Sequence, residues 1–96
     1  METQIEMKPS DYVRKGWCRG TFAMDVEGRQ APIQSPRAVA WCISGAVRKA
    51  AREDHTIMEK WFTLIESKIG RYMLHWNDDP VRRKEEVVAL LMSVGL

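Results

Sequence analysis

The sequence predicts a mainly α-helical α+β fold, with about four helices and a small β-hairpin around one core. Two observations lead to this prediction. Apolar residues recur at helical spacing in the middle and C-terminal parts of the chain. A strand-like run, a turn-forming segment and a second, poorer strand-like run stand together between residues 21 and 33. The length of 96 residues corresponds to one domain, so we expect a single small domain over residues 1–96.

Two helices are predicted in the first half of the chain. The first is short, beginning at Pro9 or Ser10 and ending at Gly16. The second has Ser35 as an N-cap and Pro36 at its first helical position, a combination typical of a helix start. An apolar stripe follows at helical spacing: Val39, Ile43, Ala46, Val47 and Ala50.

A small hairpin is predicted between these two helices. Residues 21–24 have the composition of a strand, and residues 25–29 contain the Asp and Gly of a turn. Residues 30–33 would form the second strand, which Pro32 would confine to the edge of a sheet.

The C-terminal half predicts two more helices. The third begins near residues 54–56 and stops at Gly70, and its wide apolar stripe predicts that it is the most buried element. Residues 71–76 are expected to connect it to the last helix, which Asp78 or Asp79 would cap. The expected core contains residues of three helices: Val39, Ile43, Trp61, Phe62, Ile65, Val87 and Leu91.

Composition excludes several classes of protein. The net charge of +2 with both signs abundant does not suit a tail that coats nucleic acid. No apolar run approaches the ~18 residues of a membrane span. Residues 1–6 lack the apolar segment of a secretion signal, so we expect a cytoplasmic protein with free thiols.

No pattern in the sequence predicts catalysis, a metal or a cofactor. Cys18, Cys42, His55 and His75 are separated by 13 residues or more, whereas zinc ligands normally come in close pairs. The same spacing gives no support for a Cys-His nucleophile, and no phosphate-binding glycine loop is present. We therefore expect a non-enzymatic protein without a small-molecule substrate.

Two aromatic segments allow alternative interpretations. On a helix, Trp41 would share a face with Arg37, Gly45, Arg48 and Arg52, as an exposed aromatic for stacking or docking. Alternatively, the hairpin covers Trp41, and Gly45 lets that backbone come close. The run 76–80, Trp-Asn-Asp-Asp-Pro, reads either as a binding motif or as helix-cap chemistry, with capping favoured.

Charged residues supply the candidate partner-binding sites. Arg48, Lys49 and Arg52 fall at a helix end that favours cations, whereas Arg82, Arg83 and Lys84 fall at a helix start that does not. The second cluster is therefore the better candidate for contact with nucleic acid, although such runs usually form a solvated face. Four acids could instead enter a basic groove that is meant for phosphate: Asp25, Glu27, Asp78 and Asp79.

Three tryptophan-containing segments resemble a family of small uncharacterised proteins of actinobacteria, bacteriophages and prophages. The segments are Gly-Trp-x-x-Gly at 16–20, Ala-Val-x-Trp-Cys-x-x-Gly-Ala at 38–46 and Trp-Asn-Asp at 76–78, followed by Glu-Val-x-x-Leu-Leu at 86–91. The similarity covers roughly residues 10 to 92. Family members usually have Thr-Gln where this chain has Cys18-Arg19, and the family has no assigned activity. The matching positions are Gly16, Trp17, Gly20, Ala23, Asp25, Gly28, Ala38, Val39, Trp41, Cys42, Gly45, Ala46, Trp76, Asn77, Asp78, Glu86, Val87, Leu90 and Leu91.

The resemblance implies a context rather than a reaction. Small proteins carried by phages often block host machinery, and anti-CRISPR proteins do so by binding a nucleoprotein complex. We therefore expect a phage- or mobile-element-encoded, non-enzymatic inhibitor that binds a host protein or ribonucleoprotein complex, in particular a CRISPR-Cas surveillance complex, and blocks its DNA binding. The alternative is a small DNA- or RNA-binding regulator that uses the Arg/Lys clusters.

Overall fold

The computed structural model describes residues 7–96; the first six residues, on which the expectation about a secretion signal rests, lie outside the described part. The predicted fold class is confirmed, with helices that predominate and a small two-stranded antiparallel sheet. The described residues form five helices, one more than expected. In chain order the elements are α1 (Pro9–Lys15), β1 (Ala23–Met24), β2 (Ala40–Trp41), α2 (Ile43–Ala50), α3 (His55–Ile69), α4 (Met73–Asp78) and α5 (Lys84–Ser93).

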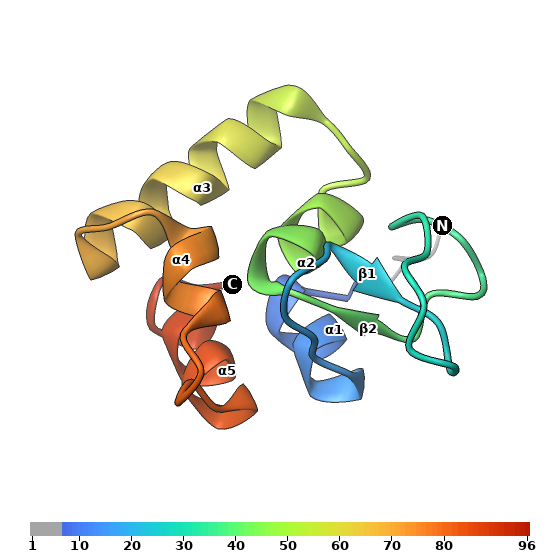
Figure 1. Cartoon of the computed structure of the whole chain (residues 1–96). Helices are drawn as coiled ribbons and strands as arrows, with labels where there is room; N and C mark the ends of the chain where they lie inside the picture. The colour runs from blue at the N-terminus through green and yellow to red at the C-terminus, as the bar shows by residue number, and fades with distance from the viewer. Residues whose placement is uncertain (1–6) are drawn as a thin grey trace.

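Helix α2 occupies the middle of the molecule. Figure 1 shows α4 and α5 on one side of it, the sheet on the other, and α3 crossing above. The first five residues of α2, residues 43–47, are all buried, and three of them are Ser, Gly and Ala, which allow neighbouring backbones to approach closely. The prediction that the third helix is the most buried element is therefore wrong. Only Met58 and Ile65 are buried in α3, because this helix packs against α2 and α4 along one edge.

Helix α2 begins at Ile43 and not at Pro36, so the predicted start of the second helix is wrong. Ser35 and Pro36 lie in a turn, where the Ser35 hydroxyl accepts a hydrogen bond from the backbone N–H of Arg37 at 3.0 Å. Ser and Pro are common both at helix starts and in such turns, so the pair at residues 35–36 does not distinguish the two. Cys42 is the N-cap instead, and its sulfur accepts a hydrogen bond from the Gly45 N–H at 3.3 Å.

The predicted hairpin is only partly present. The turn at 25–29 forms, but its two sides pair through a single bridge between Met24 and Gln30. The sheet partner of β1 is β2, with Ala23 opposite Trp41 and Met24 opposite Ala40. Residues 40–41, expected within a helix, are thus in the sheet.

The C-terminal half contains the two expected helices, α3 and α5, and an additional one, α4. Helix α3 starts and ends as predicted: Asp54 caps its first turn through its carboxylate, and Gly70 ends it with a φ of 69°. Residues 71–76 are not merely a connection, because α4 spans Met73–Asp78. Neither Asp78 nor Asp79 caps the last helix: α5 begins at Lys84, with Glu86 accepting a hydrogen bond from the Arg83 N–H at 2.8 Å.

One buried cluster joins every element of the described chain. Of the predicted core, Ile43, Ile65, Val87 and Leu91 are fully buried. Trp61 and Phe62 are partly buried against this cluster. Val39 is 40% exposed, so its assignment to the core is wrong; it precedes the strand rather than lying inside a helix. Within residues 7–96, no helix is both long and apolar enough to cross a membrane.

Candidate functional site

The three tryptophan-containing segments meet around the side chain of Asn77. Gly16 and Trp17 lie beside β2, because the Trp41 N–H donates to the Gly16 carbonyl at 3.0 Å and the Cys18 N–H donates to the Trp41 carbonyl at 3.3 Å. The third segment, at the C-terminal end of α4, brings Asn77 against both. Segments up to 60 residues apart in the sequence are thereby joined at one place.

Asn77 is completely buried, and its amide forms four hydrogen bonds. Its oxygen accepts from the Trp17 indole N–H at 2.8 Å and from the Ile43 N–H at 2.9 Å. Its nitrogen donates to the Cys18 carbonyl at 3.2 Å and to the Asp78 carboxylate at 2.9 Å. We call Trp17, Cys18, Ile43, Asn77 and Asp78 the Asn77 junction. It satisfies polar groups that burial would otherwise leave unpaired.

Two glycines make the close approach at this place possible. A β-carbon on Gly16 would lie 2.2 Å from the Val39 carbonyl oxygen, and one on Gly45 would lie 2.0 Å from the Phe22 carbonyl oxygen. Of the interpretation in which a hairpin covers Trp41, the burial of Trp41 and the close approach of the chain at Gly45 are confirmed, although Trp41 itself lies in the sheet. Trp41 is 4% exposed, and its indole N–H donates to the Ile33 carbonyl at 3.2 Å. The exposed-aromatic interpretation of Trp41 is wrong, because this residue lies on β2 and not on a helix face with the arginines.

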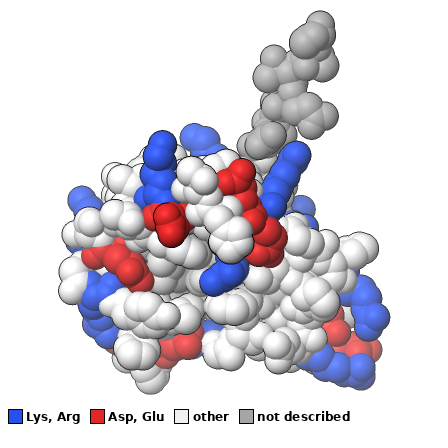
Figure 2. All heavy atoms as spheres, turned by 90° about the horizontal axis from the view of Figure 1, so that it is seen from above, with Lys and Arg blue, Asp and Glu red and all other residues white. Residues whose placement is uncertain are grey.

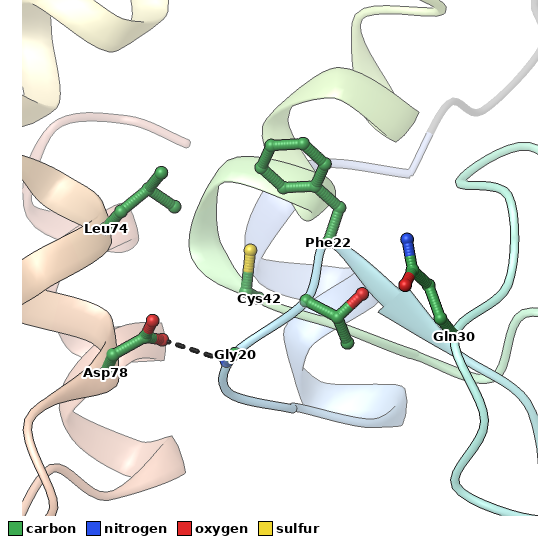
Figure 3. Close-up of a pocket in the computed structure, with 7 residues that line it drawn as sticks. Gly20, Phe22, Gln30, Cys42, Leu74 and Asp78 are labelled. Carbon is green, nitrogen blue, oxygen red and sulfur yellow. Dashed lines mark hydrogen bonds between the residues drawn. The ribbon is translucent and has the colours of Figure 1, made fainter.

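A pocket of about 300 Å³ adjoins the Asn77 junction. In Figure 3, Leu74 and Asp78 of α4 face Phe22, Cys42 and Gln30 across it. One Asp78 oxygen accepts from the Gly20 N–H at 3.2 Å as well as from Asn77. Asp78, predicted as a partner-binding residue, is therefore held at the edge of a pocket.

The two cysteines near this pocket are protonated at neutral pH. Burial, followed by the neighbouring Cys42 thiol and the Asp78 charge, raises the pKa of Cys18 to about 12. Burial is also the main reason that the pKa of Cys42 is raised. A nucleophilic or metal-binding cysteine needs a lowered pKa. Among residues 7–96 no group of three or more His, Cys, Asp or Glu side chains has a geometry that could hold a metal ion.

The predicted acidic residues Asp25 and Glu27 lie on the turn between β1 and Gln30. Asp25 Oδ1 accepts from the N–H groups of Glu27 and Arg29, at 2.9 Å each. The hydrogen bond from the Arg29 N–H is the main reason that the pKa of Asp25 lies below its ordinary value. The hydrogen bond from Glu27 and the nearby cations contribute less. Glu27 forms an ion pair with Arg29 at 2.8 Å. Asp25 thus stabilises the turn, and Glu27 carries the exposed carboxylate.

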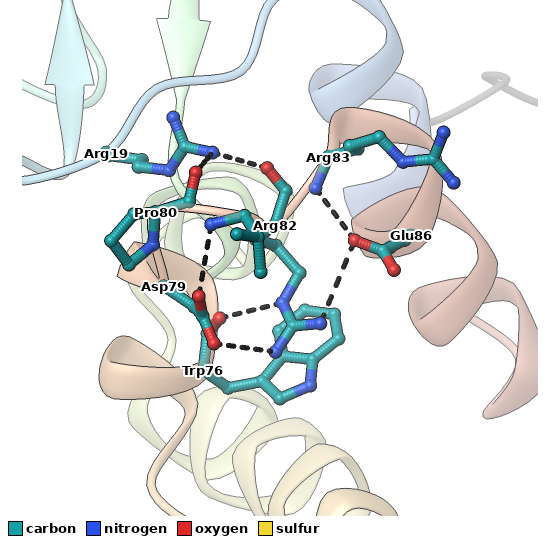
Figure 4. Close-up of polar contacts among 8 residues, drawn as sticks. Arg19, Trp76, Asp79, Pro80, Arg82, Arg83 and Glu86 are labelled. Atoms are coloured by element: carbon teal, nitrogen blue, oxygen red, sulfur yellow. Dashed lines mark hydrogen bonds and ion pairs between the residues drawn. The ribbon is translucent and has the colours of Figure 1, made fainter.

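Asp79, the fourth predicted acidic residue, takes part in a network around Arg82. Figure 4 shows the Arg82 guanidinium against the Trp76 ring, 3.8 Å from its centroid. The Nε–H of Arg82 donates to the Trp76 carbonyl at 2.9 Å. The terminal nitrogens of Arg82 form ion pairs with Asp79 at 3.9 Å and Glu86 at 3.8 Å. Arg82 has a side chain only 15% exposed, so it fixes the connection between α4 and α5. Of the basic cluster, Arg83 is exposed, and Arg82 and Lys84 are partly buried.

The basic residues at the end of α2 lie over aromatic rings. Arg48 lies 4.9 Å from the Phe22 ring centroid, and Lys49 lies 6.0 Å from that of Trp41. Figure 2, which views the molecule from the α3 side, shows positive and negative side chains interspersed with uncharged surface. No extended region of one charge is visible on that face.

A surface of mixed apolar and charged residues lies at the acidic turn. A shallow hollow of about 360 Å³ lies between the turn and the loop before β2. Val26, at the tip of the turn, is 82% exposed. We call this surface the turn edge, and it consists of Asp25, Val26, Glu27, Pro36, Arg37 and Val39.

Sequence reasoning missed the role of Asn77, which it treated as helix-cap chemistry. Each of the three matching segments contains a tryptophan, and in the third segment Asn77 directly follows it. A buried amide pairs well with an indole N–H and free backbone groups, but the sequence gives no indication that these segments meet.

Comparisons with known proteins give a family and nothing more specific. No curated protein and no solved structure is significantly similar to this chain. The model of a family of unknown function, DUF6197, matches residues 11–94, which include all three tryptophan-containing segments and the Asn77 junction. The chain therefore belongs to the family of unknown function DUF6197.

Proposed function

We propose that this protein is a phage- or mobile-element-encoded, non-enzymatic inhibitor that binds a host defence nucleoprotein complex, a CRISPR-Cas surveillance complex, and blocks its DNA binding. The turn edge is the contact surface in this proposal. The resemblance to phage proteins motivates the choice of partner, and the exposure of Val26 supports the choice of surface.

The exposure of Val26 is the observation that carries the proposal. An aliphatic side chain 82% exposed at the tip of a turn gains nothing for folding. The two hydrogen bonds to Asp25 Oδ1 hold the backbone on both sides of it, so the turn loses little conformational freedom on docking. Together with Val39, 40% exposed, it forms an apolar centre with charged residues at its rim, as in protein interfaces.

The charges of the turn edge favour a protein over a nucleic acid as the direct contact. Glu27 is paired with Arg29, and Arg37 lies beside the same hollow, so positive and negative groups alternate. A nucleic-acid surface needs a concentration of cations. The regulator alternative relies on Arg82, Arg83 and Lys84, but Arg82 is engaged with Trp76, Asp79 and Glu86.

The test measures target-DNA binding by a panel of purified CRISPR surveillance complexes with increasing amounts of this protein. The proposal predicts that the protein inhibits at least one complex. Val26→Asp should weaken the inhibition at least tenfold without changing the melting temperature, because Val26 makes no core contact. The matched control is Val81→Asp, since Val81 is 79% exposed in the loop between α4 and α5, outside the turn edge.

Two results would contradict the proposal. One is the absence of inhibition across the panel, or inhibition that Val26→Asp leaves unchanged. The other is tight, salt-sensitive binding of the purified protein to free DNA that Arg83→Ala and Lys84→Ala weaken, since this is the behaviour of a nucleic-acid-binding regulator.

A further inference from the structure

The pocket beside the Asn77 junction contains one formal charge, the carboxylate of Asp78, which has no ion-pair partner among residues 7–96. Asp78 receives hydrogen bonds from Gly20 and Asn77 on one oxygen, and no Lys or Arg of residues 7–96 forms an ion pair with it. Four of the ten other acidic side chains in residues 7–96 form ion pairs: Asp11, Glu27, Asp79 and Glu86. Asp78 is solvent-exposed and lines the pocket, so its charge is accessible to a ligand there.

The rest of the pocket lining is uncharged. It consists of apolar side chains from Phe22 and Leu74, polar neutral side chains from Thr21 and Gln30, the Gly20 backbone and the Cys42 thiol. Because burial raises the pKa of Cys42, this thiol contributes no negative charge at neutral pH. The volume of about 300 Å³ is at the lower limit of the usual range for small-molecule sites. The pocket thus combines one carboxylate with two apolar walls.

One cation near the pocket, Arg48, already has other partners. Arg48 influences the Cys42 thiol, but its guanidinium lies over the rings of Phe22 at 4.9 Å and Phe62 at 5.6 Å, and its Nε donates to Ser44 at 3.4 Å. This contact shows that the Phe22 ring accepts a guanidinium.

We propose that the Asp78 pocket binds a small organic cation, an alkylammonium or alkylguanidinium ion. Its charged group contacts the Asp78 carboxylate, and its hydrocarbon part lies between Leu74 and Phe22. The carboxylate is held in place by Gly20 and Asn77, so little ordering is needed on binding. The same chemistry is present in a free amine and in a Lys or Arg side chain of another protein. This inference does not depend on the turn edge or on the proposed partner.

The experiment is an NMR titration of the ¹⁵N-labelled full chain with n-butylammonium, n-butylguanidinium and the neutral control n-butanol at constant ionic strength. The cations should give saturable chemical-shift changes of the Gly20 amide, which donates a hydrogen bond to Asp78. The neutral control n-butanol should bind at least tenfold more weakly. Asp78→Asn should weaken cation binding at least tenfold. Asp79→Asn is the matched control and should leave it unchanged, since Asp79 pairs with Arg82 outside the pocket.

A second variant keeps the test decisive if Asp78→Asn fails to fold. Leu74→Lys places a tethered ammonium beside an intact Asp78, and it should abolish binding of the free cations. The inference is wrong if n-butanol binds as tightly as the cations, if neither cation gives a saturable shift, or if both variants still bind normally. Capped lysine and arginine methylamides then identify the source of the cation: binding as tight as that of the n-butyl ions indicates a protein side chain, and binding of the n-butyl ions alone indicates a free amine.

Discussion

Replacing Asn77 by alanine should destabilise the protein more than any surface substitution. The substitution removes the partner of three groups, namely the Trp17 indole N–H, the Ile43 N–H and the Cys18 carbonyl. Asp78 keeps its hydrogen bond from Gly20. An unsatisfied buried polar group costs about 1–3 kcal/mol, and the Trp17 indole is only partly buried, so we expect a loss of about 3–6 kcal/mol.

This loss is a large share of the total, because a domain of 96 residues is stable by about 5–14 kcal/mol. The measurement is guanidinium denaturation followed by far-ultraviolet circular dichroism. The dependence of the unfolding free energy on guanidinium concentration should be the same for the variant and the parent protein. The matched control is Gln34→Ala, which removes an exposed amide with a single 3.4 Å hydrogen bond to the Arg48 carbonyl. It should change stability by less than about 0.5 kcal/mol.

A double-mutant cycle isolates the contact between the indole and the amide. Trp17→Phe removes the N–H and keeps most of the ring, so it should cost about 1 kcal/mol alone and much less when Asn77 is already alanine. The reasoning is refuted if Asn77→Ala costs less than about 1 kcal/mol, or if the two substitutions are additive.

Three further predictions follow from burial and close contact. Gly45→Ala should destabilise by about 1–3 kcal/mol, although Gly→Ala normally stabilises a helix, because the new β-carbon would lie 2.0 Å from the Phe22 carbonyl oxygen; thermal melting checks the sign. Trp41→Ala should cost about 3–5 kcal/mol and Trp61→Ala about 1–2 kcal/mol, since Trp41 is 4% exposed and Trp61 only partly buried, and equal losses in denaturation would contradict this order. The pKa of Cys18 is raised from 9.0 to about 12, so the unfolded chain binds fewer protons than the folded one above pH 9, and stability should fall as pH rises from 9 toward 12. The slope contributed by this thiol is at most about 1.4 kcal/mol per pH unit, and Cys18→Ala should remove it in denaturation measured across that range.

The sequence determined those features that depend on neighbouring residues. The start of the third helix near residues 54–56 and its stop at Gly70 were predicted correctly, because a carboxylate facing the next N–H groups and a glycine with positive φ act locally. The turn held by Asp25 and Gly28 is of the same kind. The helical fold class also followed from the sequence, because it depends on the spacing of apolar residues.

Only the tertiary structure decided which of two local options each ambiguous segment takes. Ser35 and Pro36 suit a helix start and a turn equally well, and the pairing of residues 40–41 with β1 selected the turn. Asp78 is a residue type that can cap a helix, but at the start of the last helix it is Glu86 that accepts the hydrogen bond from the Arg83 N–H. Asp78 instead accepts hydrogen bonds from the Gly20 N–H and the Asn77 side chain. The Asn77 junction and its pocket depend on contacts between segments up to 60 residues apart, and no periodicity or cap signal reports such contacts.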